Sequence, residues 1–245
     1  MKLFFSEFES NYQKYFFPYQ VYLYKETNDD INKIYDMGFL PTRLKKDLFY
    51  LCRSLRVNLR DFELTSENRR VLKKTNYIKM NIKELKDYKY NYKIGKMGKD
   101  FYDKRFNKRV MSANKIKWLF TEGFCTHVAV YRDREEIIGY CLLVKGQNLI
   151  HYAYPFYDLR YFKKNAGMGM MLQLIIWSWK NGLNYTYLGT CYTEKALYKT
   201  QFKGCEYFTG WNWSNDIDEL KYLVRNKIKI KKLSEEIYRN FGLKF

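Results

Sequence analysis

Three apolar segments joined by short polar turns lie between residues 126 and 156, and they constrain the fold more than any other feature of the sequence. The segments cover residues 126–132, 137–145 and 149–156. Charged residues fill the first interval, and glycine with two amide residues fills the second. Such short polar intervals are typical of turns between paired strands. The pattern therefore predicts three strands in an antiparallel meander.

Helical and extended segments alternate on both sides of the meander. A helix containing Phe101, Tyr102 and Phe106 is expected before it. After it we expect, in order, a glycine-bearing loop, a helix ending at Lys180, a strand at 185–189, a helix at 194–202, a strand at 207–213 and polar helical segments that close the chain. This order predicts an α+β fold in which a mixed sheet is flanked by helices, and it resembles the core of the GNAT acyltransferases.

The first 95 residues read as a smaller, basic α/β region. Residues 29–37 have helical spacing, and Gly38 and Pro41 are expected to stop that helix. Residues 48–59 alternate like one strand that carries arginines on one face.

A short helix is expected next, capped by Thr65 or Ser66. One side of it is strongly cationic through Arg69, Arg70 and Lys73. Residues 79–98 have few periodic apolar positions, and we interpret them as the connection between two regions. The predicted division is an N-terminal region at 1–95 and a GNAT-like domain at 96–245.

The charge of the chain favours a polyanionic partner. Lys and Arg number 45 against 26 acidic residues, which gives a formal net charge of +19. Codon bias in an AT-rich gene would also enrich lysine, but it does not explain the arginines that cluster between Arg53 and Arg70. Basic surfaces with aromatic side chains suit RNA phosphates and unstacked bases, so we expect RNA contact.

Composition excludes several classes of protein. Hydrophobic residues make up 47% of the chain and aromatic residues 20%, too much for a disordered protein. The longest apolar run, 168–179, is too short to span a bilayer, and residues 1–10 do not have the features of a signal peptide. We therefore expect a cytoplasmic protein that does not bind membranes, and we expect a monomer.

The five cysteines are widely spaced and form no Cys-x-x-Cys pair. With only His127 and His151 available, the sequence predicts reduced thiols, no metal site and no catalytic Cys/His pair. The two histidines fall in predicted strands, where we expect ordinary sheet residues. No cofactor is expected.

Residues 163–169, Lys-Lys-Asn-Ala-Gly-Met-Gly, resemble the GNAT loop Arg/Gln-x-x-Gly-x-Gly/Ala, with Lys164 in the first place. Gly167 and Gly169 would let the backbone approach a ligand, and Lys163, Lys164 and the helix N–H groups would favour phosphate. By resemblance, this loop holds the CoA pyrophosphate in acetyltransferases and faces the tRNA acceptor end in enzymes that use charged tRNA. The alternative is a tight turn whose glycines serve packing.

A more specific resemblance joins two separated parts of the chain. The first part includes Tyr50-Leu51-Cys52-Arg53 and the run from Ser66 to Asn76, which contains Arg69 and Arg70. The second includes Tyr152, Tyr154, Tyr157 and Asp158, then Tyr187-Leu188-Gly189, then Leu197-Tyr198-Lys199-Thr200-Gln201-Phe202. In this order they resemble the motifs of leucyl- and arginyl-tRNA–protein transferases.

The sequence also departs from that family. The family's Cys-Pro-Tyr is Phe17-Pro18-Tyr19 here, and Cys52 alone remains of its cysteine cluster. Gly204 stands where the family has a proline after the Tyr198 motif. The resemblance therefore implies the fold and the reaction type more directly than the donor amino acid or the target.

The resemblance implies aminoacyl transfer from charged tRNA, as co-substrate, to a protein or peptide N-terminus. It implies catalytic roles for Tyr187, Tyr198 and Lys199, and acceptor contacts for Lys199, Gln201, Tyr154 and Asp158. A cation at Lys199 would suit an acidic N-terminal residue. By analogy Arg69, Arg70, Lys73, Lys163, Lys164, Gly167 and Gly169 contact the tRNA.

Several of these residues have a structural alternative. The tyrosines, drawn from 25 in the chain, are candidates for core packing, Lys199 and Gln201 for a solvated helix face, and Arg69 with Arg70 for a surface charge run. At the level of function, two further hypotheses stay open: a CoA-dependent GNAT N-acetyltransferase and a non-catalytic tRNA-binding relative.

Overall fold

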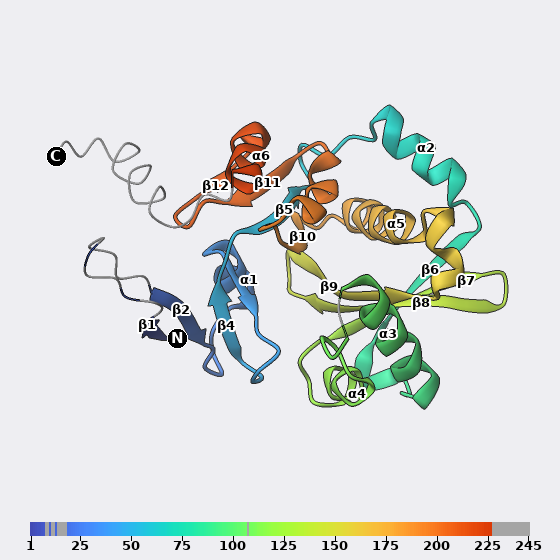
Figure 1. Ribbon diagram of the computed structural model, residues 1–245, viewed down its shortest axis with the longest axis horizontal. Coiled ribbons are helices and arrows are strands. Elements are labelled where there is room, and N and C mark those ends of the chain that lie inside the picture. Colours follow the sequence, from blue (N-terminus) through green and yellow to red (C-terminus); the bar gives the residue numbers. More distant parts are fainter. Residues whose placement is uncertain (8–9, 11–12, 14–18, 107, 227–245) are drawn as a thin grey trace. The chain divides into compact units, whose positions relative to one another are not determined.

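The computed structural model describes residues 1–7, 10, 13, 19–106 and 108–226 (Figure 1). The chain divides into two compact units. Unit 1 combines Met1–Arg56 and Gly189–Gln201 with the chain from Cys205 onward, and unit 2 combines Val57–Leu188 with Phe202–Gly204. The division at residues 95 and 96 stays a prediction.

Unit 2 is built on a mixed sheet that contains the expected meander. Its strands are β6 (Ile78–Glu84), β7 (His127–Asp133), β8 (Glu136–Lys145), β9 (Leu149–Tyr157) and the first part of β10 (Tyr185–Thr190), in the order β10-β9-β8-β7-β6. The neighbours from β6 to β9 pair antiparallel, which confirms the meander. Strand β10 pairs parallel with β9 through Tyr185–Tyr187 and Leu149–His151. The predicted mixed sheet is therefore confirmed.

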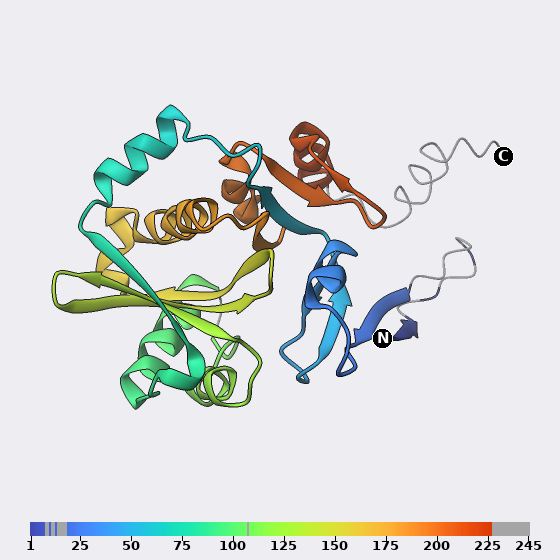
Figure 2. The ribbon, with the colours of Figure 1, turned by 180° about the vertical axis from the view of Figure 1, so that it is seen from behind.

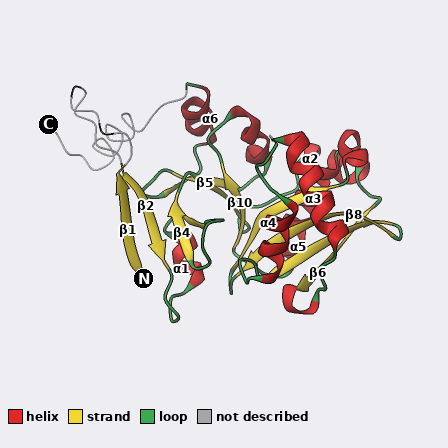
Figure 3. Ribbon diagram, turned by 60° about the horizontal axis from the view of Figure 1, so that its bottom comes forward, coloured by secondary structure: helices red, strands yellow, loops and turns green. Residues whose placement is uncertain are grey.

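Helices cover both faces of this sheet (Figure 1). Helix α5 (Ala166–Lys180) lies on one face, beside α2 (Ser66–Lys74). Helices α3 (Tyr92–Arg105) and α4 (Ala113–Thr121) cover the other face, as the view from behind in Figure 2 also shows. In Figure 3 these helices are red against the yellow strands. The sheet is thus buried between two layers, which explains its almost wholly apolar central strands.

Local signals located several helix ends correctly. Thr65 caps α2 in a capping box, with its hydroxyl accepting from the Asn68 N–H at 3.1 Å. Helix α1 (Ile31–Asp36) begins after Asp30 and is followed by Gly38, whose φ of 83° is one that glycine tolerates without strain. Both helices were predicted.

The interpretation of residues 79–98 as a connection was wrong. Ile78–Glu84 form β6, and a short 3₁₀ turn, η2 (Leu85–Asp87), then leads to α3, which already begins at Tyr92. Strand β6 is paired on one side by β7, and its exposed lysines alternate with half-buried apolar residues. Helix α4 was not predicted either.

Unit 1 contains a small antiparallel sheet in the order β1-β2-β4-β3. These strands are β1 (Lys2–Glu7), β2 (Tyr19–Tyr24), β3 (Phe39–Pro41) and β4 (Leu48–Leu51). The unit also contains the start of β5 (Ser54–Asn58), the 3₁₀ helix η4 (Glu194–Gln201), the hairpin of β11 (Cys205–Phe208) with β12 (Trp213–Ser214), and α6 (Ile217–Arg225). Segments predicted beyond residue 226, and Phe17 with Pro18, lie outside the described residues.

Two predicted strands are each divided in the structure. The strand expected at 48–59 is broken at Cys52 and Arg53 into β4 and β5. The strand expected at 207–213 is the hairpin of β11 and β12, whose turn contains Gly210 at a φ of 107°. The helix expected at 194–202 is 3₁₀ in type. Among the described residues, no helix combines the length and apolar character needed to cross a bilayer.

Candidate active site

The break between β4 and β5 brings two distant parts of unit 1 into contact. The Arg53 carbonyl accepts from the Cys191 N–H at 2.9 Å, and the Arg53 N–H donates to the Tyr192 hydroxyl at 2.8 Å. The Arg53 guanidinium carbon lies 5.5 Å from the centroid of the Tyr192 ring, in cation–π geometry. The Tyr50–Arg53 segment and the segment after β10 therefore form one cluster.

Lys199 lies in η4 and points its ammonium into the same part of unit 1. Its Nζ donates to the Thr190 carbonyl at 3.1 Å, at the end of β10. Burial lowers the pKa of Lys199, because a charged ammonium loses hydration there, while the thiol of Cys191 acts weakly in the opposite direction. The alternative of a solvated helix face does not fit this lysine.

The residues beside Lys199 fix the shape of η4. The Gln201 side chain donates to the Tyr198 carbonyl at 2.6 Å, and the Thr200 hydroxyl donates to the Leu197 carbonyl at 2.9 Å. The Tyr198 side chain is 47% exposed. Tyr198 can therefore meet a substrate without displacing the core, whereas Gln201 has one amide hydrogen engaged in holding the turn.

The thiols and phenols of the cluster stay protonated at neutral pH. Burial raises the pKa of Cys52 to about 12 and also raises that of Cys191. The pKa of Tyr192 is also raised to about 12 by local desolvation of its hydroxyl, although the residue as a whole is 54% exposed. None of these groups supplies a thiolate or phenolate, because burial favours the neutral form of each, and Lys199 is the group of this cluster whose neutral form is the deprotonated one. In the described ranges, no three or more His, Cys, Asp or Glu side chains are grouped to hold a metal ion.

Other predicted residues lie in unit 2. Tyr187 is fully buried in β10, which supports its packing alternative. Asp158 caps the 3₁₀ helix η3 (Leu159–Lys164) and accepts from Arg160 Nε at 2.9 Å, so the pKa of this carboxyl is held below its usual value. Tyr154 lies half-buried on β9.

The glycine loop is a sharp entry into α5. Asn165 takes the left-handed conformation, with φ at 60°, immediately before the helix. A Cβ on Gly169 would lie 2.6 Å from Thr75, whereas one on Gly167 would lie 3.2 Å from the Tyr157 ring. Close packing between α5 and the end of α2 therefore demands Gly169.

The cations predicted to contact tRNA differ in their surroundings. Arg70 forms an ion pair with Glu67, and its Nε donates to that carboxylate at 2.6 Å. Arg69 donates to the Leu64 carbonyl at 2.6 Å. Lys73 is exposed on α2. Lys164 lies over the ring of Tyr161 with its ammonium 4.6 Å from the centroid, and Lys163 is exposed.

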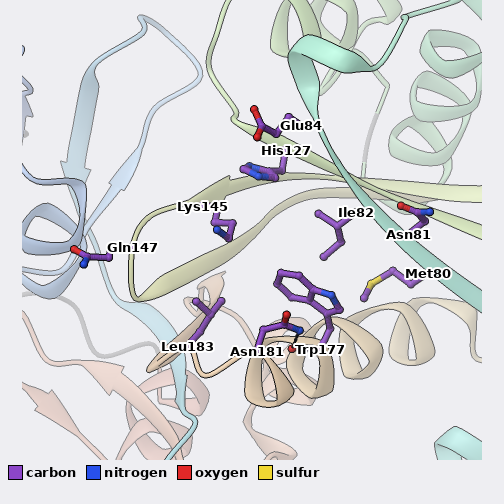
Figure 4. A pocket seen from close by; sticks show the side chains of 10 residues that line it. All are labelled: Met80, Asn81, Ile82, Glu84, His127, Lys145, Gln147, Trp177, Asn181 and Leu183. Carbon is purple, nitrogen blue, oxygen red and sulfur yellow. Dashed lines mark hydrogen bonds between the residues drawn. The ribbon is translucent and has the colours of Figure 1, made fainter.

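A separate pocket of about 640 Å³ lies in unit 2, between β6–β8 and the end of α5 (Figure 4). It is lined by Met80, Asn81, Ile82, Glu84, His127, Lys145, Gln147, Trp177, Asn181 and Leu183. Figure 4 shows the Trp177 ring beside Ile82, with Lys145 extending from β8. Burial, and then the nearby Lys145, lower the pKa of His127. None of the residues predicted from the sequence as site residues lines this pocket.

Comparison with protein families decides which family the chain represents. The family described as "Arginine-tRNA-protein transferase, C terminus" matches residues 76–209, more than half of the chain. The chain belongs to this family. The match includes Tyr187, Tyr198, Lys199 and the glycine loop, whereas the Tyr50–Arg53 segment precedes it.

Membership of this transferase family agrees with the resemblance seen in the sequence, and the fold is the expected GNAT-like α+β arrangement of a mixed sheet flanked by helices. No curated protein matches the chain.

Solved structures similar to this family member are distant in sequence. A C-terminal domain described as that of a lysylphosphatidylglycerol synthetase from Agrobacterium fabrum has 12% identity and a TM-score of 0.46, covering 69% of this chain and 54% of that chain. The L-PGS of Bacillus licheniformis has 13% identity and a TM-score of 0.41, with 71% and 55% covered. FemX has 8% identity and a TM-score of 0.41, with 66% and 59% covered. The chain thus spans little more than half the length of these solved chains.

Tyr192 and Thr190 are the cluster residues that sequence reasoning missed. Thr190 directly follows the Tyr187-Leu188-Gly189 motif of the family, and Tyr192 stands three residues after Gly189 and seven before Lys199. Their position at the end of a predicted strand was the available signal, because strand ends commonly carry site residues. Their contacts with Arg53 and Lys199 depend on the tertiary fold.

Proposed function

We propose that this chain transfers an amino acid, of the arginine or leucine type, from charged tRNA to the N-terminal α-amine of a protein or peptide. The family match supports aminoacyl transfer in general. The observation that carries the proposal is the cluster in unit 1, where the Tyr50–Arg53 segment meets the segment that holds Lys199. These are the two separated parts of the sequence that resemble the tRNA–protein transferases.

The reaction needs little from the protein beyond placement. An aminoacyl ester is already activated, and an α-amine with a pKa of about 7.7–8.0 is partly neutral at pH 7. The amine nitrogen attacks the ester carbonyl, an amide bond forms, and the bond to the tRNA ribose oxygen breaks. The proton lost by the amine goes to that leaving oxygen, through water or the exposed Tyr198 hydroxyl. Holding amine and ester at attack distance supplies much of the acceleration.

Lys199 would select the acceptor. The side-chain carboxylate of an N-terminal Asp or Glu would favour the ammonium form of this lysine, opposing the effect of burial on its pKa. Acceptor binding and Lys199 protonation are therefore coupled. The carboxylate would gain a charge-assisted hydrogen bond in a partly desolvated place, where such a bond is strong.

A panel of radiolabelled aminoacyl-tRNAs tests the proposal, with peptides that begin with Asp, Glu, Arg or Lys as acceptors and acetyl-CoA as the donor control. We expect label from charged tRNA to enter peptides with acidic N-termini. Absence of labelled peptide with every donor and acceptor would overturn the proposed activity.

Lys199→Gln tests the site itself, with Lys195→Gln as the matched control on the exposed side of the same η4 turn. Loss of a charge-assisted hydrogen bond of about 1.5–3 kcal/mol predicts a decrease in kcat/KM for acidic acceptors of roughly 10- to 150-fold. The control should keep full activity. Equal activity of the two variants would contradict the role of Lys199.

A further inference from the structure

Exposed aromatic rings and unneutralised cations gather where the end of α3 meets η3, within unit 2. Phe106 is 60% exposed and Phe162 is 45% exposed, large fractions for rings in a folded domain. Beside them lie the cations Arg105, Lys163 and Lys164. We call these five residues the aromatic–cation patch.

Contacts between rings and cations hold the patch together. The Arg105 guanidinium carbon lies 4.5 Å from the centroid of the Phe162 ring and so joins the end of α3 to η3. Lys164 lies over Tyr161, and Tyr161 stacks on Tyr77 with the ring centroids 5.8 Å apart and the planes at 29°. The Tyr77 hydroxyl donates to the Lys164 carbonyl at 3.2 Å. The η3 backbone around Phe162 is therefore held by Arg105 at the end of α3 and by Tyr77 in the segment after α2.

Acidic groups near the patch are engaged by other side chains: Asp133 accepts from the Tyr161 hydroxyl at 3.2 Å, and the others are paired with cations. Arg160 binds both Asp158 and Glu136, and Lys99 binds Asp103 at 2.8 Å. Within residues 19–106 and 108–226, no carboxylate forms an ion pair with Arg105, Lys163 or Lys164. The patch therefore presents net positive charge around flat apolar surfaces.

This chemistry matches a single nucleic-acid strand better than other anions. An unpaired base supplies a flat surface that stacks on an aromatic ring, and its phosphate supplies the charge that Arg and Lys bind. An acidic peptide would use the cations but leave the rings exposed. Phe162 stays 45% exposed although the Arg105 guanidinium lies over its ring, so part of the side chain is accessible to a base.

We propose that the aromatic–cation patch binds an unpaired RNA nucleotide, with its base stacked on Phe162 and its phosphate held by Arg105 and Lys163. We take this nucleotide to belong to the single-stranded acceptor end of a charged tRNA, and that part of the inference rests on the proposed function. The stacking site itself needs only RNA.

Fluorescence anisotropy with two RNA probes tests the stacking site: a short unstructured single strand, and a hairpin of similar charge whose paired stem is closed by a structured tetraloop with no free single-stranded nucleotides. Loss of one stacked base, about 1–3 kcal/mol, predicts that Phe162→Ala weakens single-strand binding by about 5- to 150-fold. Binding of the paired hairpin should change much less. Phe162→Trp should restore single-strand affinity, whereas Phe162→Leu, which keeps the apolar character, should not.

Trp118→Ala is the matched control, because Trp118 is also exposed and also carries a cation, Lys115, 4.0 Å from its ring centroid on α4. This control should leave single-strand binding unchanged. Arg105→Gln should reduce the slope of log affinity against log salt by about 0.7, the contribution of one single-strand phosphate.

Equal losses for Phe162→Ala and Trp118→Ala, or equal losses on the single strand and the hairpin, would overturn the stacking site. Vesicles of anionic phospholipid provide a further arm. Vesicle binding that depends on Phe162, without RNA binding that does, would assign the patch to a lipid surface instead. The assay uses neither charged tRNA nor peptide. The binding site can therefore stand if aminoacyl transfer fails, and it can fall while transfer is observed.

Discussion

Replacement of Gly169 by alanine separates the two interpretations of the glycine loop. If the glycines serve packing, Gly169→Ala must lower stability, because its Cβ would lie 2.6 Å from both Cβ and Oγ1 of Thr75. Carbon atoms in ordinary contact stay about 3.5–4.0 Å apart, so α5 and the end of α2 would have to separate by roughly 1 Å. Gly167→Ala is the matched variant, since its Cβ would meet Tyr157 at 3.2 Å.

The difference between the two variants isolates the clash. Alanine gains about 1 kcal/mol over glycine within a helix, and that gain is common to both positions. Overpacking costs about 1–3 kcal/mol, and it applies to Gly169 far more than to Gly167. We therefore expect Gly169→Ala to be about 1–3 kcal/mol less stable than Gly167→Ala. For a chain of this size, that corresponds to about 2–12 °C in Tm.

Urea denaturation of both variants, with thermal melts alongside, provides the measurement. A double-mutant cycle with Thr75→Gly, which removes all three clashing atoms, should recover part of the loss at Gly169. Equal stabilities of the two alanine variants, together with weakened RNA binding in both, would refute the packing argument and support close approach of a ligand instead.

Two further predictions concern charged groups of unit 1. Because burial lowers the pKa of Lys199 below 10.5, the unfolded chain holds more protons on this lysine between the lowered value and 10.5. Lys199 therefore contributes an increase in the free energy of unfolding with pH across that window, opposite in sign to the contribution of the buried Cys52 and Cys191 thiols. The Lys199→Met variant should lack this contribution, which urea denaturation of both proteins at several alkaline pH values measures. An identical dependence of the free energy of unfolding on pH in the two proteins would contradict the prediction. Arg56 is 7% exposed and binds Asp36, which is 66% exposed, at 2.8 Å and Glu206, which is 16% exposed, at 2.6 Å. Because Arg56→Ala removes the ion pair of only one poorly solvated carboxylate, Glu206, it should cost about 3 kcal/mol in urea denaturation, the lower end for breaking a buried pair. The exposed pair of Lys203 with Glu63 is the control, where Lys203→Ala should cost less than about 1 kcal/mol; similar costs for both variants would argue against burial as the cause.

Patterns with a short period could be recognised in the sequence. The meander of β7, β8 and β9 was predicted within one or two residues, because alternation and turn chemistry are local properties. The Thr65 cap and the end of α5 at Lys180 were predicted for the same reason. The resemblance to the tRNA–protein transferases could also be recognised in the sequence, from the order of its motifs, and the family match confirms it.

Contacts between distant segments were decided by the tertiary structure alone. Strand β6 has polar residues at alternate positions, Lys79, Asn81 and Lys83, and becomes a strand because β7 supplies its hydrogen bonds. Arg53 meets Tyr192 across 139 positions of sequence, and the burial of Lys199 follows from the packing of η4. The role of Gly169 likewise depends on Thr75, which caps the end of α2. Sequence spacing carries the conformation of each segment, but the desolvation and close packing that tune a site arise only when segments meet.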